Sequence, residues 1–338
     1  MVEKIDRNLA LEVTRVTEAA AMAVARLMGR NDLELIRQVA ANAIRVAMRS
    51  VDVDGTIVIG EGRNQGEIPY LYVGEAVGNG TLPKMDVAVT PIDGLRLVSH
   101  GLPNAISLVA MAEEGSLYRN PAEVAYMNKI AVGPEVEGNI SLDQSVEWNL
   151  KNIAYAKHIP VSEVTVIVLD RPSNQNIIRE IRESGARLHL ISGGDINGAL
   201  MAALPNTGVD VLMGVGGTEQ AIQTACILKC LGGEMEGRLY PRNIAERQRM
   251  IGLGRTLQEV YRVNDLVQGN NVFVSVTGVT GSERLEAVRY SEQGVHTHSL
   301  TMRSKSGTIR DVRSRHSLEK LMRYSEIEFL KPEEALTT

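Results

Sequence analysis

The sequence has little cysteine and no long apolar segment. Its only two cysteines, Cys226 and Cys230, are four residues apart in a helical pattern, so they share one apolar helix face. This spacing predicts buried free thiols and argues against a disulfide or a metal-binding pair. No apolar run approaches the roughly 20 residues of a membrane span, and the first residues, MVEKIDRNLALEV, are charged from the third onward. We therefore expect a cytoplasmic protein without a membrane partner.

The sequence also lacks a concentration of basic residues. Its 36 lysines and arginines are scattered through 338 residues, and the net charge is −5 with a pI near 5.8. Nucleic acid is therefore not an expected partner. The hydrophobic content of 44% is sufficient for one large layered domain or two subdomains.

The order of elements predicts an α/β fold. Hydrophobic periodicity indicates two helices in the first 50 or so residues, the first ending at Gly29 and the second capped by Asp32. Three buried strands follow, in the segments TIVIG, MDVAVTP and AISLVAMAEEG.

Residues 164–230 then alternate between strand and helix, which is typical of a mostly parallel sheet. A helix over about residues 243–262, a strand in NVFVSVTGVTG and a strand pair near THSLTMRS and GTIRDVRS are expected in the last part. We expect an N-terminal subdomain over residues 1–160 and a C-terminal α/β subdomain over residues 161–338, with the site between them.

The turn VAVTPIDGLRL, residues 87–97, matches a metal-binding pattern of phosphatases only in part. A strand that ends Asp-Pro-Ile-Asp/Glu-Gly-Thr supplies two carboxylates, a carbonyl and a hydroxyl. Mg²⁺ and Mn²⁺ favour such oxygen ligands, and two or three of these ions can bind a phosphoryl group and deprotonate a water. Here Thr90 replaces the first acid and Leu95 the threonine, while Asp93 and Gly94 remain.

Taken together, several segments resemble the class II fructose-1,6-bisphosphatases of the lithium-sensitive, metal-dependent sugar phosphatase superfamily. They span nearly the whole chain: EVTRVTEAAAMA, DGTIVIGEG, VAVTPIDG, YMNKIAVGP, LDRP, ISGGD, LMGVGG and TGVTGSERLEAV. The resemblance implies a layered α-β-α-β-α sandwich. It also implies a parent reaction in carbohydrate metabolism and gluconeogenesis: hydrolysis of fructose-1,6-bisphosphate, or also sedoheptulose-1,7-bisphosphate, with Mg²⁺ or Mn²⁺.

The resemblance implies five acidic metal ligands, and three of these acids are replaced by other residues in this sequence. The five acids correspond here to Arg37, Glu61, Thr90, Asp93 and Gln220, so two carboxylates remain and metal binding could involve only Glu61 and Asp93. Their formal charge is −2, or −1 with Arg37 included, against the +4 of two divalent ions. We expect the Arg37 guanidinium to replace a metal and pair with Glu61, and also with Asp93.

Two further substitutions weaken the implied chemistry, and two acids leave an alternative open. Leu95 cannot position the attacking water, and Leu33 replaces a family lysine beside the helix acid. A shifted register would bring Glu67, in an apparent insertion after IGEG, or Glu219, beside Gln220, into a rebuilt site.

The sugar-phosphate positions implied by the resemblance are partly kept. Ser173 replaces a basic residue and Gly193 an acid. Residues that match are Asp93, Gly94, Tyr126, Arg171, Gly194, Asp195 and Gly217.

The remaining candidates have structural interpretations. His296 and His298 alternate on one strand and share a face, which favours partly exposed strand histidines over a metal pair. We expect His100 near the active-site side, and a solvated face at Arg303 and Lys305.

The leading hypothesis is a catalytically impaired family member that acts by binding a phosphosugar. It would act as a dimer or tetramer, or with an active paralogue. The alternatives are an active sugar phosphatase with a rearranged site and a purely structural subunit.

Overall fold

The computed structural model describes residues 9–62, 70–119 and 124–324. They form two compact units: residues 1–114 together with 270–338, and residues 115–269. The second unit is thus inserted into the first, and the boundary expected near residue 160 falls inside it. The two units are described separately below.

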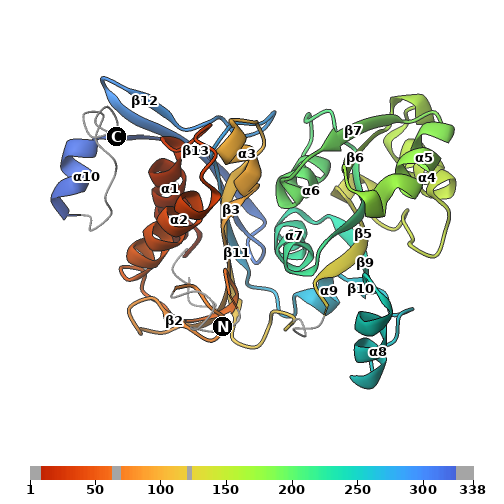
Figure 1. Ribbon diagram of the computed structural model, residues 1–338, viewed down its shortest axis with the longest axis horizontal. Coiled ribbons are helices and arrows are strands. Elements are labelled where there is room, and N and C mark those ends of the chain that lie inside the picture. Colours follow the sequence, from red (N-terminus) through yellow and green to blue (C-terminus); the bar gives the residue numbers. More distant parts are fainter. Residues whose placement is uncertain (1–8, 63–69, 120–123, 325–338) are drawn as a thin grey trace. The chain divides into compact units, whose positions relative to one another are not determined.

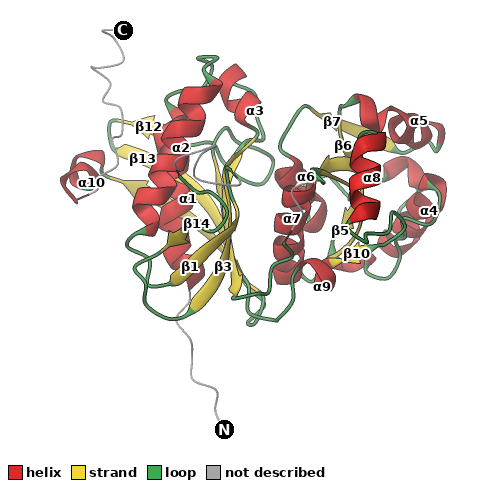
Figure 2. Ribbon diagram, turned by 60° about the horizontal axis from the view of Figure 1, so that its bottom comes forward, coloured by secondary structure: helices red, strands yellow, loops and turns green. Residues whose placement is uncertain are grey.

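The first unit contains a mixed eight-stranded sheet in its described part, in the order β12-β13-β11-β4-β3-β1-β2, with β14 paired to β13. Strands β1 and β3 are parallel neighbours, and the other pairs are antiparallel (Figure 2). The strands are β1 Asp54–Ile59, β2 Ala76–Val77, β3 Lys84–Asp93, β4 Ile106–Glu113, β11 Phe273–Gly278, β12 Arg289–Ser291, β13 Gly294–Arg303 and β14 Thr308–His316. The helices are α1 Leu9–Ala25, α2 Leu33–Met48, α3 Leu95–His100 and α10 Leu318–Tyr324.

Helix α1 packs across strands β4, β11 and β13, and α2 packs beside it (Figure 1). The predicted cap of α2 is confirmed, because the Asp32 carboxylate accepts a hydrogen bond of 2.9 Å from the Leu35 N–H. Polar side chains lie within this contact: Thr17 of α1 is hydrogen bonded to Ser275 and Thr277 of β11 at 3.0 and 2.7 Å. These hydroxyls fix how the helix lies on the sheet, since each buried group needs its partner.

The second unit is built on a six-stranded mixed sheet of order β10-β9-β5-β8-β6-β7. The strands predicted over residues 164–230 are parallel as expected, since β6 pairs in parallel with β7 and with β8. Strands β5, β9 and β10 extend the sheet by antiparallel pairs, so the sheet as a whole is mixed and not mostly parallel. The strands are β5 Tyr126–Val132, β6 Thr165–Leu169, β7 Arg187–Ile191, β8 Val211–Gly217, β9 Glu234–Leu239 and β10 Tyr261–Arg262. The helices are α4 Val146–Lys157, α5 Gln175–Glu183, α6 Asp195–Ala203, α7 Thr218–Leu231, α8 Ile244–Gly252 and α9 Val263–Leu266.

Helices α4 and α5 cover one face of this sheet, and α6 and α7 the other (Figure 1). Helix α4 is missed by the periodicity argument because its apolar side is narrow, with Leu150, Ile153 and Ala154 buried. Helix α8 ends at Gly252, ten residues before the expected end, and Gly254 follows with a φ of 71°.

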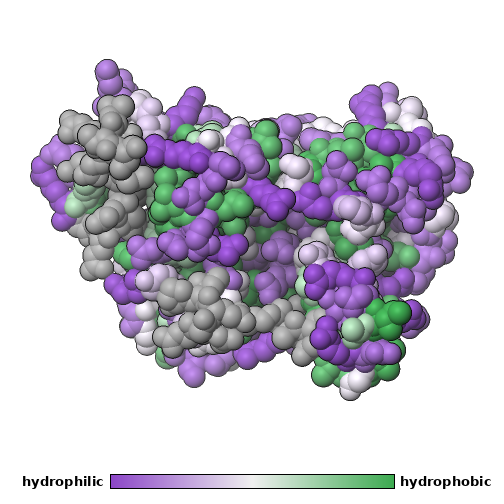
Figure 3. Space-filling model, in the orientation of Figure 1, coloured by the Kyte–Doolittle hydropathy of each residue, from purple (hydrophilic) through white to green (hydrophobic). Residues whose placement is uncertain are grey.

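The predicted α/β class is confirmed, and Cys226 and Cys230 are buried free thiols of α7 as expected. Burial raises the pKa of the Cys226 thiol, so it is unreactive at neutral pH. None of the helices among the described residues is long and apolar enough to cross a bilayer. On the face drawn in Figure 3, hydrophobic areas are interrupted by hydrophilic residues, as on an ordinary protein surface.

Candidate functional site

The turn VAVTPIDGLRL lies at one edge of the first-unit sheet, where strand β3 ends. Because β1 and β3 are parallel neighbours, the segments after their carboxyl ends emerge at the same edge. Glu61 follows β1 by two residues, and Asp93 is the last residue of β3. Asp93 is buried and Glu61 half-buried. The structure therefore positions the two retained acids at the ends of adjacent strands.

Arg37 on α2 reaches this edge and forms an ion pair with Glu61. The distance from its Nε to the Glu61 Oε2 is 3.6 Å, with the Arg37 side chain 42% exposed and that of Glu61 15% exposed. The expected ion pair is confirmed, and its length makes it a charge contact instead of a short hydrogen bond. The additional contact of Arg37 with Asp93 stays a prediction.

The residues after Asp93 form a tight turn into a short helix. Gly94 has a φ of 92°, and a Cβ there would lie 2.7 Å from a Leu97 side-chain carbon. Glycine is therefore required on both backbone and steric grounds. Helix α3 begins at Leu95, whose apolar side chain stands where the metal-binding pattern has a hydroxyl.

The donor set at this turn does not fit two divalent cations. Two carboxylates are present, one of them paired with a guanidinium, so the charge that would hold two ions close together is lacking. The described residues also contain no cluster of three or more histidine, cysteine, aspartate or glutamate side chains arranged to bind a metal. Glu67 lies outside the described residues.

In the second unit, the Asp195 carboxylate is bound to a buried lysine. The Lys129 Nζ on β5 donates a hydrogen bond of 2.6 Å to the Asp195 Oδ2 at the start of α6, and the two side chains are 0% and 8% exposed. Gly216 makes room for this pair, since a Cβ there would lie 2.2 Å from the Asp195 Oδ2 and 2.4 Å from the Lys129 Nζ. Gly194, with a φ of 81°, provides the turn before α6.

Tyr126 and Gly217 are paired directly across β5 and β8. The Gln220 side chain folds back on the same point, because its Oε1 would lie 1.7 Å from a Cβ at Gly217. The Arg242 guanidinium lies over the Tyr126 ring, 5.2 Å from its centroid. Glu219, in the first turn of α7, is half-buried, and its role in a rebuilt site stays a prediction.

Arg171 connects two strand ends at the surface of the second unit. Its Nη1 donates to the Asp170 carbonyl at 3.0 Å and its Nη2 to the Ser192 carbonyl at 2.5 Å. A guanidinium has five N–H donors, so three remain for a ligand as far as the described residues are concerned. The structure thus brings Tyr126 and Gly217 together, and it positions Arg171 and Asp195 after the ends of the neighbouring strands β6 and β7.

Comparison with known proteins decides which family this is. The family model described as bacterial fructose-1,6-bisphosphatase, glpX-encoded, matches residues 7–316. Fructose-1,6-bisphosphatase 1 class 2 of Escherichia coli (strain K12) is 37% identical over 327 residues, which is 93% of this chain and 96% of that protein. The chain belongs to the class 2 fructose-1,6-bisphosphatase family. Fructose-1,6-bisphosphatase class 2 proteins of Escherichia coli O6:H1 and Shigella flexneri match with the same identity and coverage.

Within this fructose-1,6-bisphosphatase fold, sequence reasoning missed the partners of the retained residues. Lys129, Gly216 and Arg242 contact or accommodate family positions, yet none was a candidate. One signal was available: a lysine in the middle of the apolar strand MNKIAV indicates a buried ionic partner, because lysine is almost never fully buried unless paired.

Two expectations about basic residues of this family member are corrected. His298 is buried, not partly exposed: its Nδ1 accepts the Glu286 N–H at 3.1 Å, and its Nε2 lies 2.8 Å from the Asp311 Oδ1. Arg303 is also buried, packed over the Phe273 ring, whereas Lys305 is exposed.

His100 and His296 are the other two histidines that the sequence analysis considered. The His100 Nδ1 lies 3.0 Å from the carbonyl of Arg96 in its own helix, and His296 is half-buried on the same sheet face as His298.

Proposed function

We propose that this member of the class 2 fructose-1,6-bisphosphatase family binds a phosphosugar in the cytoplasm without hydrolysing it. It would act as a homo-oligomer or together with an active paralogue. The ion pair between Arg37 and Glu61 carries the proposal, because a guanidinium contacts an acid to which the family resemblance assigns a metal. The formal charge of Glu61, Asp93 and Arg37 is −1, which does not offset two divalent cations.

The absence of a hydroxyl at position 95 also supports the proposal. Metal-assisted hydrolysis requires a positioned water as well as a cation, and the apolar Leu95 side chain cannot hydrogen bond to one. Loss of charge and loss of this hydroxyl affect separate parts of the same reaction. Restoring only the carboxylates, or only the hydroxyl at position 95, is therefore insufficient for turnover.

Binding is supported by the second unit. Arg171 retains three free N–H donors of its fork, a geometry suited to phosphate. Tyr126 and Asp195 are held in place by their contacts with Arg242 and Lys129. The expected ligands are fructose-1,6-bisphosphate and fructose-6-phosphate.

A phosphate-release assay with Mg²⁺ and with Mn²⁺ tests the loss of hydrolysis, using fructose-1,6-bisphosphate and sedoheptulose-1,7-bisphosphate. We expect no metal-dependent turnover, and the same background rate for the wild type and Glu61→Ala. Metal-dependent turnover that Glu61→Ala abolishes would overturn the proposal. It would establish the alternative, an active phosphatase with a single-metal site. The 37% identity to fructose-1,6-bisphosphatases over most of the chain favours this alternative.

Thermal denaturation with fructose-6-phosphate tests binding separately. A ligand that binds the native state raises the melting temperature once its concentration exceeds its Kd. We expect a rise for the wild type that is smaller in Arg171→Gln. Arg187→Gln, an exposed charge on β7, is the matched control and should behave like the wild type. No rise for the wild type would favour a purely structural subunit.

A further inference from the structure

A row of cation-forming side chains crosses three strands of the first unit. His296 on β13 is paired with Arg289 on β12 and with Arg315 on β14. Side chains of directly paired residues project from the same face of a sheet, so these three lie next to one another. The next row on this face pairs His298 with Arg313.

The acids in this region are already paired with arginines, one of which is Arg289 of the row. Glu286 forms ion pairs of 2.8 Å with Arg289 and 3.2 Å with Arg313, and Asp311 forms one of 2.8 Å with Arg284. The four arginines 284, 289, 313 and 315 and these two carboxylates give a formal charge of +2 with both histidines neutral. In a chain of net charge −5, this is a local excess of positive charge.

Two donors remain without a protein partner. Neither the Arg315 guanidinium nor the His296 imidazole forms an ion pair or side-chain hydrogen bond with the residues that the structure describes. Together with Arg289 they line one recess, so their N–H groups are available to a single ligand. A tetrahedral dianion can accept from all three, whereas a planar carboxylate has two oxygens and one charge.

The same side chains line a recess of about 160 Å³. One liquid water occupies roughly 30 Å³, so the recess admits a phosphate group with a few waters but no nucleoside. It shares Glu286, Ala287 and Arg289 with a wider hollow of about 660 Å³ that is also lined by Thr280 and Ser282. A molecule attached to the phosphate would extend into this hollow, where hydroxyl groups are available.

We propose that this recess binds the phosphate group of a small metabolite. The site uses residues of the first unit, whereas the family positions Arg171 and Asp195 belong to the second unit. Its donors are Arg289, Arg315 and His296, and Glu286 and Asp311 hold the neighbouring arginines in place. The small size of the recess and the acidic character of the chain argue against a polyanion such as nucleic acid.

Calorimetric titration of the full chain with inorganic phosphate, at constant ionic strength set by chloride, tests the proposal. We expect saturable binding that Arg315→Gln weakens about tenfold, because a hydrogen bond to a charged group is lost. Arg30→Gln removes the same charge from an exposed position of the same unit and should leave the Kd unchanged. Equal Kd values for these two variants would contradict the proposal.

Histidine NMR locates the bound ion. The chain has six histidines, and we expect phosphate to shift the His296 ring signals at the concentrations that saturate the calorimetric binding. Arg171→Gln separates this site from the sugar-phosphate side, and should leave both the His296 shift and its Kd intact. If Arg171→Gln abolished all phosphate binding while Arg315→Gln abolished none, the recess would not be a phosphate site.

Discussion

Two of the carboxylates that the sequence analysis assigned to ligands, Glu61 in the first unit and Asp195 in the second, differ in how they are held. The Arg37–Glu61 ion pair is 3.6 Å long and its arginine is 42% exposed. The Lys129–Asp195 pair is 2.6 Å long, and neither side chain is more than 8% exposed. The first contact is adjustable, whereas the second belongs to the packed framework of its unit. A family position can thus belong to the packed framework in one unit and remain adjustable in the other.

Breaking the Lys129–Asp195 pair should have the largest effect. In Lys129→Met the Asp195 carboxylate stays buried without its cation, and we expect a loss of about 3–5 kcal/mol in the free energy of unfolding. Urea denaturation monitored by circular dichroism measures this loss. Lys151→Met, which removes an exposed lysine paired with Glu147, should leave the midpoint unchanged. A similar small change in both variants would mean that the buried pair does not stabilise the fold.

Restoring carboxylates in the first unit should create cation affinity. In Arg37→Asp combined with Thr90→Asp, the formal charge at the turn changes from −1 to −4, as four carboxylates replace the present set. We expect Mn²⁺ to stabilise this variant, by about 2.7 kcal/mol at a concentration 100 times the Kd, and to leave the wild type unaffected. The matched control carries asparagine at both positions and should not respond. Stabilisation of the control as well would show that charge is not the limiting factor.

Crowding the buried pair should have a smaller effect than breaking it. The Cβ of Gly216→Ala would lie 2.2 Å from the Asp195 Oδ2, so the ion pair or the strand must move. We expect a loss of about 1–3 kcal/mol, measured by denaturant unfolding. Gly252→Ala is the control, because nothing lies within 4 Å of its Cβ position. A wild-type stability in Gly216→Ala would indicate a more adaptable site.

The Arg37–Glu61 pair can be measured with a double-mutant cycle. Arg37→Ala, Glu61→Ala and the double variant should give a coupling free energy of about 0.2–1 kcal/mol, because the arginine is partly exposed and the distance is long. The coupling should decrease in high salt, as exposed charge interactions are screened. A coupling above 3 kcal/mol would mean that the Arg37–Glu61 pair is held as strongly as the buried Lys129–Asp195 pair of the second unit.

The sequence predicted the family and the main elements because both rest on local pattern. Glycine-bounded apolar runs identified β1, β3 and β4, and Asp32 marked the start of α2. The family motifs located every candidate position along the chain. The prediction of an Arg37–Glu61 contact succeeded because an isolated acid and an arginine at neighbouring family positions need compensation.

The sequence did not predict properties that depend on contacts between distant segments. The antiparallel pairing of β5 with β8 and β9 joins residues that are 79 or more positions apart in the sequence, which no local pattern encodes. The burial of His298 depends on Glu286 and Asp311, which reach it from a loop and from the adjacent strand β14. The insertion of one unit within the other is likewise visible only once β11 is seen beside β4.

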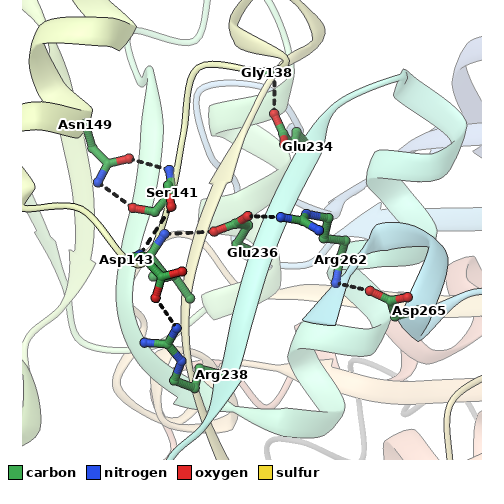
Figure 4. Close-up of polar contacts among 10 residues, drawn as sticks. Gly138, Ser141, Asp143, Asn149, Glu234, Glu236, Arg238, Arg262 and Asp265 are labelled. Carbon is green, nitrogen blue, oxygen red and sulfur yellow. Dashed lines mark hydrogen bonds and ion pairs between the residues drawn. The ribbon is translucent and has the colours of Figure 1, made fainter. Parts of the chain in front are cut away.

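Glu234 extends the comparison to a carboxylate that is held by a backbone N–H. Its Oε2 accepts the Gly138 N–H at 2.5 Å, while the neighbouring Glu236 is bound to Arg262 (Figure 4). Burial raises the pKa of Glu234 above its ordinary value of 4.5; the hydrogen bond from Gly138 opposes this, and the charges of Glu236 and Glu137 add to it. The folded state therefore binds this proton more tightly than the unfolded state does.

This linkage predicts a small, pH-dependent gain of stability in Glu234→Gln. Because the folded-state pKa is raised, the ionised group destabilises the fold once the pH exceeds that pKa, and the penalty disappears below pH 4.5, where both states are protonated. The variant, whose amide oxygen can still accept from Gly138, should exceed the wild type by about 0.5 kcal/mol at pH 7 and match it near pH 4. Urea denaturation across this range measures the difference. Glu183→Gln, at an exposed position of α5, should show no such trend, and a flat difference for Glu234→Gln would mean that its hydrogen bond, not its burial, dominates.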